Sequence, residues 1–295
     1  MSALAPIIDS HQRIDPFYDP VTCSWSYILV DLASKACAVI DPVLNFDPAS
    51  GRVSYELADS LLARIDAEGW SCHWILETHI HADHLSSGDY LRGRTGAQIG
   101  IGAGVRSVSA LFEPAFNLGS DHPDVEACFD RLFEPDESVL LGELQIKVLA
   151  TPGHTPGCVA YSADSAIFVG DTLFMPDYGT ARSDFPGGDA GQLFDSVMGL
   201  LSADPETKLY FCHDYPLPER PTPQCSITVG AQKANVQLQD RNRAQFVEFR
   251  HHRDSQLATP RLLYPAIQIN LAAGQLPTPD PLGQRYLKLP ITVAR

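Results

Sequence analysis

The sequence predicts an α/β protein built as a four-layer αββα sandwich, with a C-terminal appendage that is partly helical and partly extended. Strand-like and helix-like segments alternate along the chain in two halves, which favours two sheets covered by helices. Three segments that carry His or Asp each follow an apparent strand, so their polar side chains share one strand-to-loop context. The 295 residues, 44% of them hydrophobic, suffice for one large core with an appendage.

The composition argues against several classes of protein. A net charge of −15 disfavours nucleic acid or an anionic membrane as the main partner. The first nine residues lack a basic start and a long apolar run, so no secretory signal is expected, and no segment approaches the ~20 apolar residues of a membrane-spanning helix. Seven cysteines form no Cys-x-x-Cys pair, which indicates free thiols in a reducing compartment and predicts a cytoplasmic location.

The first part of the chain predicts a hairpin, a helix and a buried strand. Two short strand-like runs over 25–31 and 36–42 form the hairpin. Apolar spacing predicts an amphipathic helix over 53–68, and Gly69 closes it. The run over 73–78 then predicts a strand that leads into the first His-rich segment.

The middle of the chain predicts further strands around a long insertion. A strand is expected at 98–101, and the stretch over 102–135 is interpreted as a loop-rich lid or decoration. Residues 138–150 predict a pair of strands, and two more strand-like runs follow over 158–161 and 166–169.

The last third predicts both helical and extended segments. A helix is expected at 192–201, a strand at 208–212 and mostly helix over 228–257. Residues 266–271 and the Pro-rich tail to residue 295 are expected to be extended.

The most informative stretch is residues 78–84, with the sequence THIHADH. In an extended chain His79 and His81 point to the same face, so their imidazoles converge. If a helix starts after them, Asp83 and His84 come from its first turn and face a second point about 3.5–4 Å away, the separation of paired catalytic metals. A single His is usually a core residue, but burying four such groups unpaired costs several kcal/mol, which a bound cation offsets. The spacing suits one metal or two.

Two later segments present similar chemistry. Prolines and glycines on both sides of His154 predict a rigid loop that lets the backbone approach a ligand closely. Asp171 stands at the end of a buried strand, where a carboxylate is costly unless it is paired or bound to metal. His213 and Tyr215 directly follow the predicted strand at 208–212.

Four motifs carry a family resemblance: THIHADH at 78–84, TPGHTPG at 151–157, GDTLF at 170–174 and CHDY at 212–215. They resemble the metal motifs of the metallo-beta-lactamase superfamily, whose αββα fold holds its metals at one edge. Within it, the chain resembles the glyoxalase II branch and, more closely, the persulfide dioxygenases and their bacterial beta-lactamase-like hydrolase relatives. Residues 179–190 are similar to the Gly-Arg-Thr-Asp-Phe segment of those dioxygenases. Thr180 and Ala181 depart from the usual residues, and the C-terminal segment is longer than in mitochondrial members.

The resemblance implies a ligand set for one metal ion. His79, His154 and Asp171 are expected to bind one Fe(II) per chain and to leave three positions open. In glyoxalase II relatives four further side chains complete a dinuclear site, whereas in the dioxygenases they mostly orient ligands and water. These four are His81, Asp83, His84 and His213. All the potential ligands are present, so ligand counting alone favours two metals.

The resemblance also implies a reaction, the oxidation of glutathione persulfide by O₂ to sulfite and glutathione. Tyr215 and Asp83 are the expected catalytic residues, and Arg182 is expected to hold a glutathione carboxylate, unless it pairs with Asp184 or Asp189. Iron permits the electron transfer that zinc does not. The alternative is a dinuclear zinc hydrolase of a glutathione thioester. A persulfide sensor without turnover is a third hypothesis, and a homodimer is a further expectation.

The C-terminal part of the chain differs in charge from the rest. Residues 225–295 carry nine Lys and Arg against four Asp and Glu, which suits either a solvated helix face or a cationic wall for an anionic small molecule. Five of these basic residues lie on predicted helical segments, namely Lys233, Arg241, Arg243, Arg250 and Arg253. We expect residues 1–224 to form the catalytic domain and 225–295 an extension packed on it.

Overall fold

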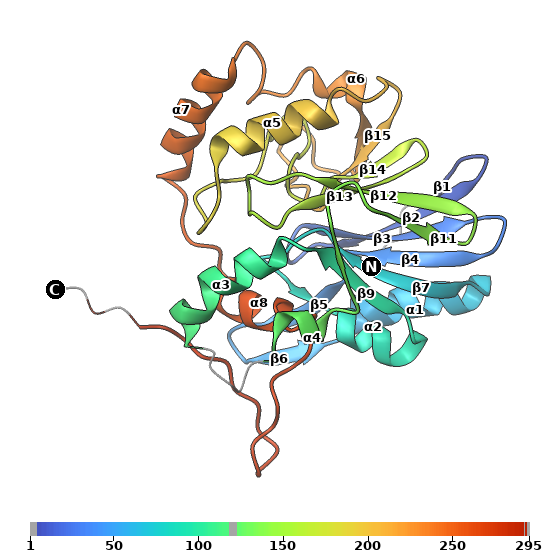
Figure 1. Cartoon of the computed structure of the whole chain (residues 1–295), viewed down its shortest axis with the longest axis vertical. Coiled ribbons are helices and arrows are strands. Elements are labelled where there is room, and N and C mark those ends of the chain that lie inside the picture. Colours follow the sequence, from blue (N-terminus) through green and yellow to red (C-terminus); the bar gives the residue numbers. More distant parts are fainter. Residues whose placement is uncertain (1–4, 118–122, 292, 294–295) are drawn as a thin grey trace.

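Two β-sheets face each other, and helices cover the outer side of each (Figure 1). The computed structural model describes residues 5–117, 123–291 and 293. Helices α1, α2, α3 and α8 lie on the outer side of the first sheet, and α5, α6 and α7 lie on that of the second (Figure 1). This arrangement confirms the αββα sandwich.

The strands form two large sheets and one small one. The first sheet has the order β1-β2-β3-β4-β7-β9-β10, the second β11-β12-β13-β14-β15-β16 and the third β6-β5-β8. The strands of the first sheet are β1 (Ile7–Ile8), β2 (Gln12–Asp19), β3 (Ser24–Asp31), β4 (Ala36–Ile40), β7 (Ser71–Glu77), β9 (Gln98–Gly102) and β10 (Arg131–Phe133). Those of the second are β11 (Ser138–Leu141), β12 (Leu144–Ala150), β13 (Val159–Ala163), β14 (Ala166–Phe168), β15 (Lys208–Tyr210) and β16 (Ser226–Thr228). Those of the third are β5 (Val43–Asp47), β6 (Arg52–Ser54) and β8 (Leu85–Ser86).

The helices follow the strands on both halves of the molecule. Their bounds are α1 (Glu56–Glu68), α2 (Gly88–Thr95), α3 (Val105–Phe116), α4 (Val125–Cys128), α5 (Ala190–Leu200), α6 (Val229–Gln232), α7 (Arg243–Asp254) and α8 (Leu263–Asn270). None of the helices in the described residues is long and apolar enough to cross a membrane. All seven cysteines are free thiols, as expected.

Strand β3 shows how the layers form. Every residue of β3 is buried, because the strand has a packed layer on each face. Trp25, Tyr27 and Leu29 point into the core between the two sheets, whereas Ile28 and Val30 point into the core under the helices. Alternate residues of a strand face opposite sides, so one short segment connects the two cores.

Two expectations about secondary structure were wrong. The stretch read as loop over 102–135 contains the helix α3, in which Val105, Val108 and Phe112 pack on the first sheet at helical spacing. Residues 118–122 of that stretch lie outside the described residues. Residues 266–271, expected to be extended, belong mostly to α8. The last five residues of this helix are all buried, so they show no exposed polar face at helical spacing.

The C-terminal segment packs on the sandwich. Strand β16 adds to the edge of the second sheet, α7 packs near α5, and α8 contributes Ile267 to the core under the first sheet. The boundary at residue 224 stays a prediction. After α8 the chain stays buried through Ala273, projects as a loop and returns to the body, where Leu287 packs on a core cluster (Figure 1).

The loop that carries His154 is held against α5 by a glycine. Gly153 has φ +141°, and a Cβ at this position would lie 2.3 Å from the backbone N and Cα of Leu193. We expect Gly153→Ala to lower the free energy of unfolding by about 2 kcal/mol or more, because both the backbone angle and the close approach forbid a side chain. Urea denaturation of the metal-free protein measures this.

Gly199→Ala is the matched control for that substitution. Gly199 lies in α5 with no atom within 4 Å of a Cβ, so alanine should raise stability by about 0.5–1 kcal/mol. If the two substitutions changed the free energy of unfolding in the same way, the loop would not depend on the close approach of Gly153 to Leu193.

Candidate metal centre

The candidate ligands come from loops that leave the ends of neighbouring parallel strands. In the first sheet β4 and β7 run parallel, so Asp41 and Thr78 follow adjacent strand ends. In the second sheet β14 and β15 run parallel, and the chain beyond them carries Asp171 and His213. Because parallel strands end at the same edge of a sheet, the polar side chains gather there.

His79 and His154 both approach the carboxylate of Asp171. The Nε2 atoms of His79 and His154 both lie 3.7 Å from the same Asp171 atom, Oδ2. Ligands at right angles on one ion with bonds of about 2.1 Å lie about 3 Å apart, so each imidazole is within ~1 Å of the distance that a cation shared with Asp171 would require.

A second group shares Asp171. The His213 Nε2 atom lies 3.4 Å from Asp171 Oδ1 and 3.3 Å from Asp83 Oδ2. The helix that follows, α2, begins only at Gly88, so Asp83 and His84 lie in the preceding loop and not in a first helical turn. They still reach the second group because the loop folds back toward the strand ends, and His84 Nδ1 lies 3.5 Å from Asp83.

Hydrogen bonds at Nδ1 fix which ring nitrogen carries the proton in two of the imidazoles. His154 Nδ1 lies 2.7 Å from the carbonyl oxygen of Arg182, which only accepts, so the proton is on Nδ1. His79 Nδ1 lies 3.0 Å from the Thr78 hydroxyl, which donates to Asp41 and therefore accepts from His79. Both rings thus keep an unprotonated Nε2, the form that binds a metal.

Ser24 likewise fixes which ring nitrogen carries the proton in His84 and in His213. Its hydroxyl lies 3.3 Å from His84 Nδ1 and 3.2 Å from His213 Nδ1. Because Ser24 donates to Thr22 at 2.8 Å, and Thr22 donates to Asp19 at 2.6 Å, Ser24 is left to accept from both rings. The lone pair of each ring then lies on Nε2.

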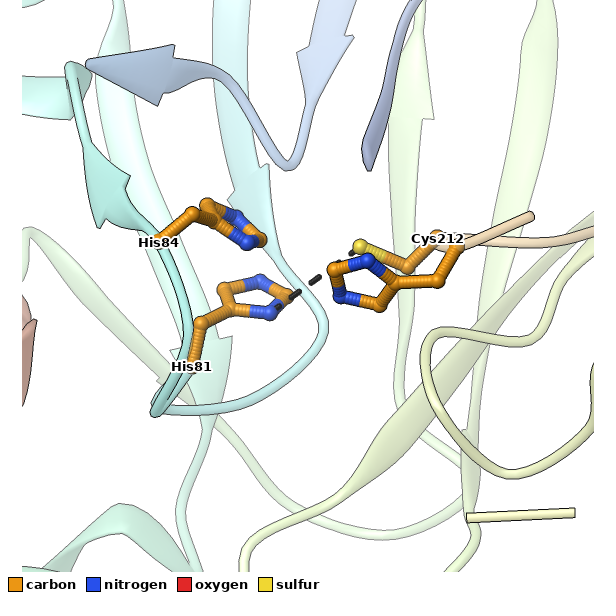
Figure 2. Close-up of side chains that lie close together, drawn as sticks. His81, His84 and Cys212 are labelled. Atoms are coloured by element: carbon orange, nitrogen blue, oxygen red, sulfur yellow. Dashed lines mark hydrogen bonds between the residues drawn. The ribbon is translucent and has the colours of Figure 1, made fainter. Parts of the chain in front are cut away.

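His81 is oriented the other way round. Its Nε2 lies 3.1 Å from Asp41 and 3.8 Å from Glu77, so this nitrogen carries the proton. Its Nδ1 lies 3.9 Å from the Cys212 sulfur (Figure 2). The ring is therefore engaged at both nitrogens, although its centroid is only 4.0 Å from that of His79.

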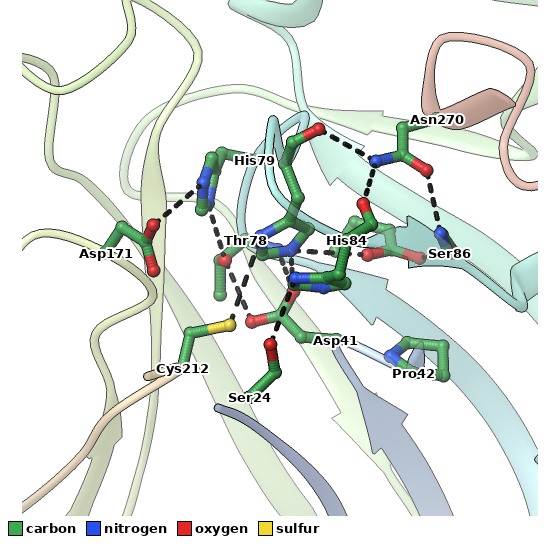
Figure 3. Close-up of polar contacts among 12 residues, drawn as sticks. Ser24, Asp41, Pro42, Thr78, His79, His84, Ser86, Asp171, Cys212 and Asn270 are labelled. Atoms are coloured by element: carbon green, nitrogen blue, oxygen red, sulfur yellow. Dashed lines mark hydrogen bonds and ion pairs between the residues drawn. The ribbon is translucent and has the colours of Figure 1, made fainter. Parts of the chain in front are cut away.

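Sequence reasoning missed the groups that support the ligands. The Asn270 amide donates to the carbonyls of His81 and His84, both at 2.9 Å, and accepts from the Ser86 backbone at 2.7 Å (Figure 3). Asp41 accepts from the backbone and hydroxyl of Thr78. Asp41 follows a strand as Asp171 does, so its position in the sequence could have predicted a place in the site. Asn270 lies 189 residues from His81, and no sequence pattern predicts their contact.

Buried polar atoms without partners fit a bound cation. Within the described residues, His79 Nε2, His84 Nε2, His213 Nε2 and Asp171 Oδ1 are buried and have no hydrogen bond. Leaving such atoms unpaired costs about 1–3 kcal/mol each, and a metal ion would satisfy them together.

The charge states of the site residues also fit a bound cation. Burial, followed by the neighbouring imidazoles, keeps the pKa of His79 well below its usual value, so His79 is neutral. Burial raises the pKa of Asp171 to about 7. Burial alone would lower the pKa of His213, but the carboxylates of Asp171 and Asp83 raise it. A cation would favour the ionised form of these carboxyl groups.

A cavity of about 470 Å³ opens onto the site, a volume typical of small-molecule pockets. Asp83, His154 and Asp171 line the cavity. Tyr215 also lines it, and its hydroxyl makes no hydrogen bond among the described residues. The Tyr215 ring stacks on His213 with centroids 5.7 Å apart and on Tyr178 at 4.6 Å. Tyr215 is thus fixed beside the ligands with its hydroxyl available.

The cationic side chains of the cavity divide into two kinds. Arg182 makes a bidentate contact with Asp184, at 2.6 and 2.8 Å, and Arg250 is buried and paired with Asp254. Arg253 and Arg261 also line the cavity, and neither has a carboxylate within 4.0 Å among the described residues. Lys233, Arg241 and Arg243 lie outside the cavity lining. His251 and His252 are exposed, as expected.

The site arrangement matches a known family. The model of the metallo-beta-lactamase superfamily matches residues 20–213. The chain belongs to this superfamily. Its αββα fold and its buried His, Asp and Cys cluster are those of a metal-binding metallo-beta-lactamase superfamily enzyme.

Several members of the superfamily are similar over most of the chain. A probable metallo-hydrolase of Burkholderia pseudomallei is 45% identical over 289 residues, covering 94% of this chain and 98% of that protein. The human mitochondrial persulfide dioxygenase ETHE1 is 30% identical over 201 residues, covering 67% and 66%. The crystal structure of ETHE1 from Myxococcus xanthus superposes with a TM-score of 0.72 at 26% identity, covering 89% and 99%.

The raised pKa of Asp171 has a consequence for the metal-free protein. Its pKa is about 7 in the folded chain and about 4 in the unfolded chain, so the stability of the folded state falls as pH rises from 4 to 7 and stays lower above 7. We expect metal-free Asp171→Asn to be more stable than the parent at pH 8 by about 1 kcal/mol or more, and the difference to shrink at pH 5. Urea denaturation at the two pH values measures it. A difference that does not change with pH would contradict this account.

The Asn270 amide should tighten metal binding from outside the ligand set. We expect Asn270→Ala to weaken metal affinity about tenfold or more, because the carbonyls of His81 and His84 lose their common donor. Competition with a chelator measures the affinity. Asn235→Ala is the control, since Asn235 is equally buried but bonds to Gly179 and Gln232. Equal metal affinities for Asn270→Ala and Asn235→Ala would show that the hydrogen bonds of Asn270 do not affect metal binding.

Proposed function

We propose that this chain is a glutathione persulfide dioxygenase that uses one Fe(II) held by His79, His154 and Asp171. The observation that carries the proposal is the engagement of His81 at both ring nitrogens, by Asp41 and by Cys212. This leaves His79 and His154, each with Nε2 at 3.7 Å from Asp171 Oδ2, as the imidazoles available beside that carboxylate. Two histidines and one carboxylate on one face are the ligand set of non-haem iron enzymes that react with O₂.

The reaction balances with water as the third reactant. Glutathione persulfide, O₂ and water give glutathione and sulfurous acid, which ionises to sulfite. The outer sulfur is oxidised by four electrons and O₂ is reduced by the same four. Fe(II), when bound, supplies the electron path between sulfur and oxygen that zinc lacks.

The chain's own residues position the substrate. The Tyr215 hydroxyl, which has no partner among the described residues, is placed to donate a hydrogen bond to a persulfide sulfur in the cavity. Asp83 also lines the cavity, where its carboxylate would accept a hydrogen bond from water. Arg253 and Arg261 offer cations to the two carboxylates of glutathione, whereas the guanidinium of Arg182 is held by Asp184. A role for Arg182 in substrate binding stays a prediction.

The alternative is a dinuclear zinc hydrolase that cleaves a glutathione thioester. The group formed by Asp83, Asp171 and His213 favours it, because these atoms lie close enough to hold a second ion. The name of the Burkholderia pseudomallei relative, a probable metallo-hydrolase, points the same way. The similarity to proteins named persulfide dioxygenase favours oxidation.

Metal analysis together with an assay of products tests the proposal. We expect protein purified without oxygen to hold one iron per chain and to form sulfite with O₂ uptake from glutathione persulfide. Asp171→Asn should lose both, whereas His251→Ala, a change at an exposed residue, should keep both. Protein with two zinc ions and no iron that turns over a glutathione thioester but forms no sulfite would overturn the proposal.

Arg253 should affect binding of the substrate more than its conversion. We expect Arg253→Gln to raise KM for glutathione persulfide about tenfold with kcat nearly unchanged, because one charged contact is worth about 1.4 kcal/mol in this setting. A persulfide without carboxylates should show no such change. Arg241→Gln, outside the cavity lining, is the control. If both variants gave the same KM, Arg253 would have no part in recognition.

The expectations about partners and location stay predictions, because the proposed reaction does not depend on them. They are a homodimer, the absence of nucleic-acid binding and a cytoplasmic location.

A further inference from the structure

A buried carboxylate on α7 contacts the peptide group that orients His154. Asp254 is the last residue of α7 and is 2% exposed, and its Oδ2 atom accepts a hydrogen bond at 2.9 Å from the backbone N–H of Ser183. The carbonyl oxygen of Arg182, which accepts from His154 Nδ1 at 2.7 Å, belongs to the same peptide group as that N–H. The proposed reaction gives Asp254 no role.

One peptide group therefore joins this carboxylate to the imidazole. A trans peptide bond is planar, and its C=O and N–H point in opposite directions, so Asp254 and His154 contact its two ends. Hydrogen bonds in such a chain polarise one another. A carboxylate that accepts from the N–H shifts electron density toward the carbonyl oxygen, which then accepts more strongly from His154.

The other contacts of Asp254 hold its carboxylate in this position. Arg250 donates to Oδ1 from Nε at 2.9 Å and from Nη2 at 2.7 Å, which leaves Oδ2 for Ser183. Arg250 is 1% exposed and also donates to Gln237 at 2.7 Å, so the pair belongs to a buried network. An ion pair this deeply buried adds little net stability, because removing both charges from water costs about as much as their attraction returns. Stability alone therefore does not account for it.

A more strongly held proton on Nδ1 makes His154 a better metal ligand. Metal-binding histidines usually donate their second N–H to a carboxylate or a carbonyl, which fixes the tautomer and raises the basicity of the ligating nitrogen. Here the carbonyl of Arg182 is itself polarised by a carboxylate. The Nε2 atom of His154 thus gains part of the effect of a direct carboxylate contact.

We propose that Asp254 is a positioning residue of the metal centre, which acts on His154 through the peptide group between Arg182 and Ser183. Within the described residues Asp254 belongs to no group of metal-ligating side chains, so it acts from outside the ligand set. The inference rests on His154 as a metal ligand, which the proposed dioxygenase and the hydrolase alternative both require. Metal affinity is measured without substrate, so a failure to form sulfite would leave the inference standing.

A double-mutant cycle tests whether Asp254 acts through His154. We expect Asp254→Asn to weaken zinc binding by the metal-free protein about tenfold, the lower end of the range for such partners, because a peptide group intervenes. Competition with a chelator measures the affinity. In a His154→Ala background the same substitution should leave the zinc affinity unchanged. An equal loss in both backgrounds, or no loss in the parent background, would overturn the inference.

Ser183→Ala is the matched control for the peptide group. This substitution removes the hydroxyl, which also donates to Asp254 at 3.2 Å, but it keeps the backbone N–H. Its zinc affinity should equal that of the parent protein. A tenfold loss in Ser183→Ala would show that the hydroxyl carries the effect, and the role of the peptide group would be wrong.

NMR spectra of the metal-free protein with ¹⁵N-labelled histidine test the same hydrogen bond without a metal. Because Asp254→Asn leaves the buried charge of Arg250 unpaired and can prevent folding, the variant used here is Arg250→Gln/Asp254→Asn, which removes both charges. We expect the parent His154 to carry its proton on Nδ1 with a low-field resonance, and this resonance to move to higher field in the double variant. A proton on Nε2 in the parent protein, or a resonance that does not move, would overturn the inference.

Discussion

The burial of Asp171 among imidazoles is the constraint on which the rest of the site depends. Removing a carboxylate from water is costly, and here burial raises the pKa of Asp171 to about 7. Neutral imidazoles cannot repay that cost, because each lies 3.4–3.7 Å away without forming a hydrogen bond. A cation shared by these groups would offset the cost of burying the carboxylate. The need for such a cation explains why the two pairs of parallel strands bring their polar ends together at one edge. The fold therefore gathers buried polar groups that a bound cation would stabilise.

The hydrogen bonds behind the ligands decide what the site can hold. Arg182, Thr78 and Ser24 each accept from an Nδ1 atom, so four rings keep Nε2 unprotonated, while Asp41 turns His81 the opposite way. His154 and Asp171 line the cavity, so a cation held there would be accessible to a small molecule.

The sequence predicted the layers, and the gathering of His and Asp side chains at one edge, because both depend on local patterns. Alternating strand and helix segments predicted the sandwich, and the strand ends before His79, Asp171 and His213 placed the ligands at one edge. Long-range packing was beyond such patterns. The last five residues of α8 are all buried, so they were expected to be extended. Asn270 reaches the carbonyls of His81 and His84 only because α8 packs beside the loop that carries them. The helix α3 had a usable apolar spacing that neighbouring glycines obscured.

Anomalous diffraction from crystals of the iron-loaded protein tests the central claim most directly. The account expects an iron peak about 2.0–2.2 Å from His79 Nε2, His154 Nε2 and an oxygen of Asp171. An iron peak bonded to His81 Nδ1 as well, or one that lies outside bonding distance of Asp171, would contradict it.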